Sequence, residues 1–390
     1  MERARLVAAS VEVNRVPHGP QRLAAREELL AAAEQSGDPG AVASVLLDLA
    51  GDQHHHGGTG AGTAALARAW QIRRTNPEVF DARLHGKLRL VFPAVLEGLV
   101  RRRDLPRPEI DRLADEMEGL YRSCGFSLRA VHRSRHLIHR VAGEQEAASA
   151  RIEAMLSEPG DAHSFCGAFY HYIAALWFER LRDWERAALE CRAILAEGAS
   201  CRCGPSHLAN GHNELMYCLL RLGRFEQARV VREAGYPLVR GVERQWRHVM
   251  QHILLADLTG DTEYGLRVVR DHAGWLSRGS AKVGECWLLA MIALRFLGRV
   301  EAEGGGKRVL VPDEGGGRGL TVARLRADLD AELAELVVKR DAAAGGERFR
   351  RLLEKYRHKA GAAREKEKVV VPDGADCGVT ADVDAICADD

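Results

Sequence analysis

Hydrophobic positions recur with helical spacing along most of the chain, in pairs of runs separated by short breaks. The breaks at Gly143, Arg182, Gly223, Gly260 and Gly298 follow one another at intervals of 39, 41, 37 and 38 residues. An apolar helical run lies on each side of a break, which predicts a helical hairpin. We call the helix before the break helix A and the helix after it helix B. A hairpin cannot bury its apolar face alone, so hairpins at a regular period are expected to stack.

The hairpins are predicted most clearly between residues 127 and 275. The expected A and B helices are Ser127–Arg140 with Gln145–Leu156, Cys166–Leu181 with Trp184–Ala196, His207–Leu222 with Phe225–Ala234, and Gln245–Leu258 with Thr262–Trp275. Ala281–Leu297 is expected to be a last A helix. Earlier breaks near Gly60 and Arg102 fit the same period, so the array is expected to begin near residue 20.

The pattern changes after Gly298. Lys307–Asp313 lies between two glycine loops and is predicted to be a short strand. Lys368–Gly374 also contains Val-Pro-Asp and is a candidate partner strand, with Pro limiting both segments to an edge or a strand end. Thr321–Asp341 has helical periodicity, with Thr321 as its expected N-cap. The expected organisation is a leader (residues 1–19), a helical-repeat array (20–300), a Gly-rich linker (301–320), a C-terminal helical segment (321–360) and a flexible tail (361–390).

The hairpin breaks resemble those of the tetratricopeptide repeat (TPR) superfamily. In that family's 34-residue pattern a Gly ends helix A and an Ala follows five positions later. The matching pairs here are Gly143/Ala148, Arg182/Ala187 and Gly223/Ala228, whereas Gly260 is followed by Gly265. The chain as a whole also resembles a group of actinobacterial proteins of this architecture. The resemblance implies an all-α fold, a TPR-like α-solenoid whose pitch of 37–41 residues exceeds the family's own.

Composition narrows the function classes. The chain has 56 basic and 55 acidic residues, so a nucleic-acid binder is disfavoured despite local basic runs such as Arg101-Arg102-Arg103. No apolar run approaches the roughly 18 residues of a membrane span. The first residues do not resemble a signal peptide, and the nine Cys are an odd, scattered set. We therefore expect reduced thiols and a cytoplasmic location.

A set of Cys and His residues has spacing that suggests a metal site. His163 and Cys166 precede one A helix, and Cys201, Cys203 and His207 precede the next. Mixed Cys and His ligands are typical of structural zinc. The expected ligands are His163, Cys166, Cys201 and His207, with Cys203 as an alternate, and the zinc would clip adjacent hairpins together. Chance placement of these residues in loops is the competing interpretation.

Three further histidines, His132, His136 and His139, share one face of a predicted helix. Their register argues against a metal site, because His132, His171 and His212 each lie 11 residues before a break. Side chains at that position are expected to pack or hydrogen bond between helices A and B. We therefore expect these histidines in the core.

The inner surface of the array is the remaining candidate site. The register places the following side chains there: Arg133, Arg140, Tyr172, Arg180, Asn210, Asn213, Tyr217, Arg221 and Arg247. Arg and Asn suit carboxylates and peptide backbone, and Tyr offers flat contact area. A solvated Arg-rich face is the competing interpretation.

No catalytic motif is present, including HExxH, GxSxG and the Rossmann pattern, so we expect a protein that is not an enzyme. The expected function is a scaffold or adaptor that binds a protein or peptide, with acidic segments favoured, in its concave groove. The alternatives are a regulatory protein that senses a ligand or peptide and, less favoured, a metalloenzyme that uses the Cys/His set. The sequence leaves the oligomeric state open.

Overall fold

The computed structural model describes residues 3–55, 59–102, 105–161, 164–199, 206–276, 286–311 and 319–358. Within these ranges the chain forms 18 α-helices, three short 3-10 helices and one two-stranded sheet, so the fold is all-α. None of the helices in these ranges is long and apolar enough to cross a membrane. The chain divides into two compact units between Tyr170 and His171, which we call the N-terminal unit and the C-terminal unit.

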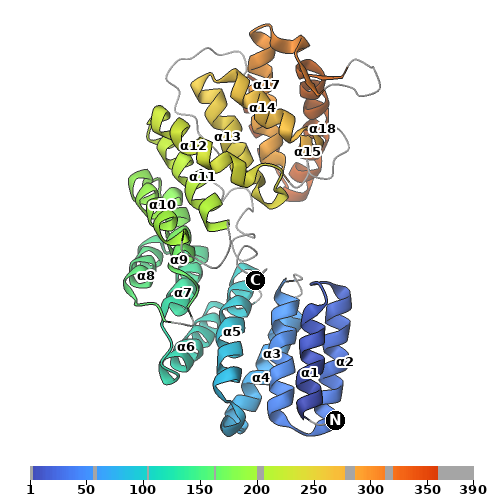
Figure 1. Cartoon of the computed structure of the whole chain (residues 1–390), viewed down its shortest axis with the longest axis vertical. Helices are drawn as coiled ribbons and strands as arrows, with labels where there is room; N and C mark the ends of the chain where they lie inside the picture. The colour runs from blue at the N-terminus through green and yellow to red at the C-terminus, as the bar shows by residue number, and fades with distance from the viewer. Residues whose placement is uncertain are drawn as a thin grey trace. The chain divides into compact units, whose positions relative to one another are not determined.

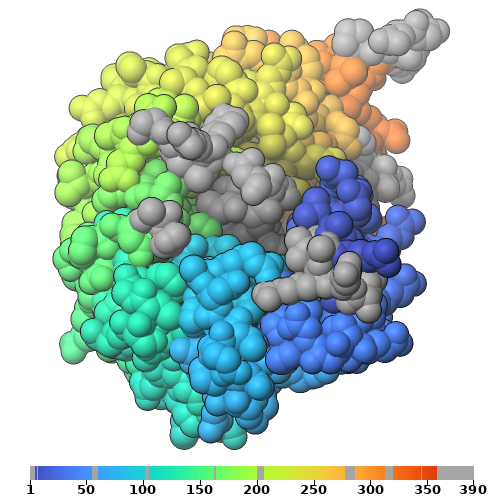
Figure 2. Space-filling view, turned by 60° about the horizontal axis from the view of Figure 1, so that its bottom comes forward, coloured from blue at the N-terminus to red at the C-terminus, as the bar shows by residue number. Residues whose placement is uncertain are grey.

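The N-terminal unit is built from helices that pack mainly against their neighbours in sequence (Figure 1). They are α1 (Arg3–Arg15), α2 (Pro20–Ser36), α3 (Pro39–His55), α4 (Thr59–Thr75), α5 (Ala82–Arg102), α6 (Arg107–Ser123), α7 (Arg129–Ala142), α8 (Gln145–Ser157) and the start of α9 (Gly167–Arg180), with the 3-10 turn η1 (Pro77–Val79). The main core of this unit joins apolar side chains of α3 to α7. In Figure 2 the blue surface of the first helices adjoins the lighter blue surface of α5.

Helix α1 forms most of the predicted leader, residues 1–19. Its Leu6 is buried in a small second core with Leu29 of α2 and Val45 of α3. A buried ion pair lies beside this core, with Arg26 Nε 2.8 Å from Asp52 Oδ2. The leader is therefore a packed helix, and sequence reasoning missed it because its apolar periodicity is weak.

The C-terminal unit continues the hairpins and ends in two longer helices. Its elements are the rest of α9, α10 (Trp184–Gly198), α11 (Ser206–Arg221), α12 (Phe225–Val239), η2 (Glu243–Gln245), α13 (Trp246–Thr259), α14 (Thr262–Asp271), α15 (Ala273–Leu276), α17 (Trp287–Ala302), η3 (Gly305–Lys307), β1 (Val309–Val311), β2 (Leu320–Thr321), α18 (Val322–Ala344) and α19 (Arg348–His358). Helices α18 and α19 pack on α17 and on each other (Figure 1).

Four of the five predicted breaks have left-handed backbone, as expected where a helix ends in an αL residue. The φ angles are 79° at Gly143, 61° at Arg182, 72° at Gly223 and 70° at Gly260. Arg182 is the one residue other than Gly with positive φ in the described part of the chain. The predicted breaks between helices A and B are confirmed at these four positions.

The fifth predicted break, Gly298, is wrong. Gly298 lies inside α17, which continues to Ala302, and its neighbours Leu297 and Val300 are buried. The apolar face therefore extends past the glycine, and the helix has no reason to end there. Left-handed backbone appears instead at Gly304, where φ is 87°.

The sheet differs from its predicted pairing. Strand β1 lies within the predicted strand Lys307–Asp313, but it pairs antiparallel with β2, and Val309 is opposite Thr321. The candidate partner Lys368–Gly374 lies outside the described residues. Thr321 is confirmed as the N-cap of α18, because its Oγ1 accepts a hydrogen bond from the backbone N–H of Arg324 (3.3 Å).

Candidate functional site

Three charged side chains from successive A helices of the C-terminal unit meet in one network. Arg247 of α13 donates from Nη2 to Glu179 Oε2 of α9 at 2.8 Å. The same guanidinium places Nη1 3.2 Å from Glu214 Oε1 of α11. Because one planar guanidinium reaches carboxylates on both other helices, it links α9, α11 and α13 directly.

Glu214 is the central acceptor of this network and is fully buried. Its Oε2 accepts a hydrogen bond from Gln251 Nε2 (2.9 Å), and His248 Nε2 lies 3.2 Å from its Oε1. Burial opposes the ionisation of Glu214, but the charge of Arg247 and the hydrogen bond from His248 outweigh it and lower the pKa to about 2. Glu214 is therefore an anion at neutral pH.

Glu179 has the opposite behaviour although it binds the same arginine. Its burial and the neighbouring Glu214 carboxylate raise the pKa of Glu179 well above its ordinary value. Two carboxylates in one buried site cannot both ionise cheaply, so one retains its proton. Such a pair can serve as acid and base in an enzyme, but both groups here are buried. We therefore interpret the network as structural.

An accessible cationic surface lies beside this network. Arg221 of α11 is half-buried, with its guanidinium 4.5 Å from the centroid of the Trp184 ring, and its Nη1 donates to the Tyr217 hydroxyl (3.4 Å). The rings of Trp184 and Tyr217 meet edge to face at 5.8 Å. The stacked indole and the phenol restrict the orientations of Arg221.

Arg180 of α9 is exposed and occupies the equivalent position in the preceding hairpin, two residues before the break. Within the described ranges, neither Arg180 nor Arg221 forms an ion pair with a carboxylate. The two helices touch close to these arginines, since Cys218 Sγ lies 4.0 Å from Glu179 Oε1. We call Arg180, Arg221, Trp184 and Tyr217 the arginine face.

The nine predicted partner-binding residues fall into three classes of burial. Five are buried: Arg133, Tyr172, Asn210, Asn213 and Tyr217. Three are half-buried, namely Arg140, Arg221 and Arg247, and Arg180 is exposed. Buried side chains contact other residues of the chain. For example, Arg133 Nε lies 2.8 Å from Glu97 Oε1. Register placed these residues on an inner surface, but it did not distinguish side chains that face solvent from those that face a neighbouring helix.

The predicted metal ligands are only partly described. His163, Cys201 and the alternate Cys203 lie outside the described residues. Cys166 is half-buried, and His207 is buried, which lowers the pKa of its imidazole. Within the described ranges no group of three or more His, Cys, Asp or Glu side chains could hold a metal ion. The zinc site stays a prediction.

Among the histidines discussed above, His136 and His171 contact helix B as expected, whereas His132, His171 and His212 are half-buried and not in the core. His136 is buried and its Nδ1 lies 3.0 Å from the carbonyl oxygen of Ala148 in helix α8. His171 pairs through Nδ1 with Glu190 Oε2 of α10 at 2.6 Å. His139 pairs with Glu144 across the break, also at 2.6 Å. These contacts are intramolecular and join helix A to the break or to helix B.

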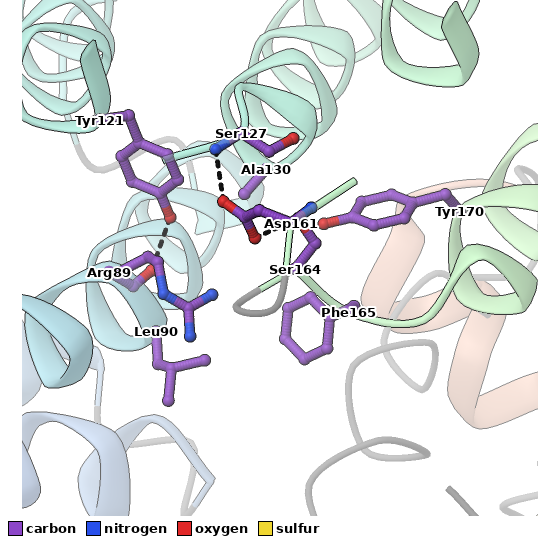
Figure 3. A pocket seen from close by; sticks show the side chains of 9 residues that line it. All are labelled: Arg89, Leu90, Tyr121, Ser127, Ala130, Asp161, Ser164, Phe165 and Tyr170. Carbon is purple, nitrogen blue, oxygen red and sulfur yellow. Dashed lines mark hydrogen bonds between the residues drawn. The ribbon is translucent and has the colours of Figure 1, made fainter. Parts of the chain in front are cut away.

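The N-terminal unit contains a small pocket that sequence reasoning missed (Figure 3). It is lined by Arg89, Leu90, Tyr121, Ser127, Ala130, Asp161, Ser164, Phe165 and Tyr170. The lining comes from α5, α6, α7, the start of α9 and the loops before α7 and after α8. Loops between hairpins have no periodic pattern, so residue spacing alone could not predict that Asp161 and Arg89 line the same pocket.

Comparison with known proteins adds no relative: no family model matches the chain, and no curated protein matches it.

Proposed function

We propose that this chain is a non-enzymatic scaffold that binds an acidic, extended segment of a partner protein on its A helices. The observation that carries the proposal is the pair Arg180 and Arg221, two accessible cations at equivalent positions of successive hairpins. Neither has a carboxylate partner among the described residues, so each is available to a carboxylate supplied from outside.

The architecture behind this proposal is a TPR-like solenoid. Left-handed breaks at Gly143, Arg182, Gly223 and Gly260, 39, 41 and 37 residues apart, support it. The small residue five positions after a break also supports it, because Ala148, Ala187 and Ala228 are fully buried. In such an array equivalent positions on adjacent A helices lie about 8–10 Å apart. That spacing suits carboxylates on alternate residues of an extended peptide, which lie about 7 Å apart.

The arginine face is also pre-organised for binding. Trp184 and Tyr217 hold Arg221 before a partner arrives, so less side-chain freedom is lost on binding. The half-buried Trp184 ring adds flat contact area of the kind that dominates many protein interfaces. Arg247 contributes less charge to this surface, because it already binds Glu179 and Glu214.

The experiment is a fluorescence anisotropy titration of the full chain with a labelled ten-residue poly-glutamate peptide at low salt. Arg180→Glu and Arg221→Glu together should weaken binding by at least about tenfold, an effect of roughly 1.4 kcal/mol. Arg351→Glu on α19 is the matched control, since this arginine is exposed and lies on another helix. Equal affinity in the double variant and the control would reject the arginine face as the site.

A structural zinc clip remains part of the proposed function, with His163, Cys166, Cys201 and His207 as ligands and Cys203 as the alternate. Its support is the residue chemistry, because Cys and His together favour zinc. Metal analysis of the purified chain should find about one zinc per molecule, and Cys166→Ser should lower that amount. Wild-type protein without zinc would remove the clip from the proposal.

A further inference from the structure

We propose that the partner segment carries an apolar side chain beside its acidic residues, and that this side chain binds on Phe225 of α12. The inference rests on the proposed function, because it extends the arginine face by one hairpin. Its basis is the position of Phe225, an aromatic side chain that is 41% exposed and that the repeat register places next to the arginines.

Phe225 is the counterpart of Trp184 in the next hairpin. Each is the first residue of its B helix and lies two residues after a left-handed break. Trp184 contacts the end of the A helix α11 through Arg221. Helix α12 packs on α13 as α10 packs on α11, so the register directs Phe225 to the corresponding end of α13.

The two aromatic residues have different surroundings. Arg221 stacks on Trp184, but its counterpart in α13 is the half-buried Leu258, which has no charge. Within the described ranges Phe225 has no aromatic and no cation–π partner. An apolar side chain from a partner would remove apolar surface of Phe225 and Leu258 from water, which a carboxylate cannot do without losing its own hydration.

An ion pair joins Phe225 to the arginine face. Arg224 Nη1 donates to Glu185 Oε2 at 3.2 Å. Arg224 precedes Phe225 and Glu185 follows Trp184, so this pair links the first turns of α12 and α10. Because Arg224 offsets the charge of Glu185, that carboxylate does not repel an acidic segment that runs from Arg221 to Phe225.

The spacing of the hairpins defines the order of the partner's side chains. Arg180, Arg221 and Leu258 each lie two residues before a break. Equivalent positions on adjacent A helices are about 8–10 Å apart, and alternate residues of an extended chain are about 7 Å apart. The partner segment therefore has two acidic residues about two positions apart and an apolar residue about two or three positions beyond them. An apolar anchor beside the charges also distinguishes this partner from wholly acidic chains.

The experiment is a fluorescence anisotropy titration of the full chain with two labelled ten-residue peptides. Both are poly-glutamate with one residue near the centre replaced, by leucine in one peptide and by alanine in the other. The two peptides have the same charge, and glutamates on both sides supply the acidic pair in either chain direction. The wild type should bind the leucine peptide at least about fivefold more tightly than the alanine peptide.

Phe225→Ala should lower the affinity ratio of the two peptides to about one and leave the affinity for the alanine peptide within about twofold of the wild type. Phe225→Leu keeps an apolar surface and should retain most of the ratio. Val230→Ala is the matched control, because this residue of α12 is 74% exposed, and it should keep the wild-type ratio.

Two results would overturn this proposal and leave the proposed function intact. One is a wild-type ratio near one with peptides that both bind, and the other is a ratio that Phe225→Ala does not change. Absence of binding by either peptide would instead overturn the proposed function, and this inference with it.

Discussion

Phe296 of α17 fills the space that a side chain at Gly265 of α14 would occupy. A Cβ built at Gly265 would lie 2.3 Å from Phe296 Cζ and 2.9 Å from the Ala256 Cβ. This packing explains why Gly replaces the Ala found five residues after the other breaks. Gly265→Ala should therefore destabilise the protein by about 1–3 kcal/mol, the usual cost of overpacking a core.

Chemical denaturation of Gly265→Ala and Gly119→Ala tests this explanation. Gly119 lies inside α6, and a Cβ there would meet no atom within 4 Å. Its replacement should stabilise the protein by roughly 0.5–1 kcal/mol, because alanine is the better helix former. If both variants lose stability equally, the packing of Phe296 is not the reason for glycine at position 265.

The two glutamates bound by Arg247 should respond differently to the same amide substitution. Glu179→Gln mimics the protonated form that its raised pKa favours, so we expect little loss of stability at pH 7. Glu214→Gln removes the anion that holds Arg247 and His248, and the cost should be about 3–5 kcal/mol. The measurement is the free energy of unfolding of each variant at pH 7. An equal loss in Glu179→Gln and Glu214→Gln would contradict a protonated Glu179 beside an ionised Glu214.

The pH dependence of the Glu214 contribution follows from its lowered pKa. Because the folded pKa of about 2 lies below the unfolded value, this stabilisation is present above about pH 4.5 and is lost as the pH falls toward 2. The stability difference between the wild type and Glu214→Gln should therefore shrink in acid. A difference that stays constant from pH 7 to pH 3 would rule out a depressed pKa at this site.

His171 and His212 occupy equivalent positions in successive hairpins but should titrate in opposite directions. The hydrogen bond with Glu190 raises the pKa of His171, whereas burial lowers that of His212. The His171 contribution is therefore present below about pH 6.5 and is lost as the pH rises through its folded pKa. For His212 the unfolded chain binds the proton more readily, so its contribution is lost as the pH falls.

The free energies of unfolding of His171→Gln and His212→Gln at pH 5.5 and pH 8.5 measure how the contribution of each histidine to stability depends on pH. The effect at His171 should stay below about 1 kcal/mol, because its imidazole is partly exposed and the pair is screened. The two variants are distinguished by the sign of this pH dependence. Relative to the wild type, the free energy of unfolding of His171→Gln should be lower at pH 5.5 than at pH 8.5. For His212→Gln it should be higher at pH 5.5 than at pH 8.5. The same sign in both variants would contradict the opposed shifts.

Sequence periodicity predicted most of the helices because burial of one helix face repeats every 3.6 residues. It also placed four of the five breaks, where the residues are Gly143, Arg182, Gly223 and Gly260. It failed at Gly298, because the buried apolar face of α17 continues past this glycine to Val300. The local signal of a break is therefore ambiguous without the packing partner.

The functional residues were harder to predict than the helices. Register selected the exposed Arg180 and the half-buried Arg221, but it treated the buried Asn213 in the same way. The network of Glu179 and Glu214 was missed because an acidic residue in an apolar helix face has no partner visible in sequence. Such contacts join residues 30 to 70 positions apart, and only packing defines them.

Helices α18 and α19 pack on α17 and on each other. The apolar stripe of α18, formed by Leu325, Leu329, Leu333 and Val337, is buried in this contact layer. A stack of hairpins otherwise ends in an open apolar face, which a second molecule could extend. Packing of these two helices therefore keeps an apolar surface of α17 and α18 out of solvent, where it would otherwise be open to association with another molecule.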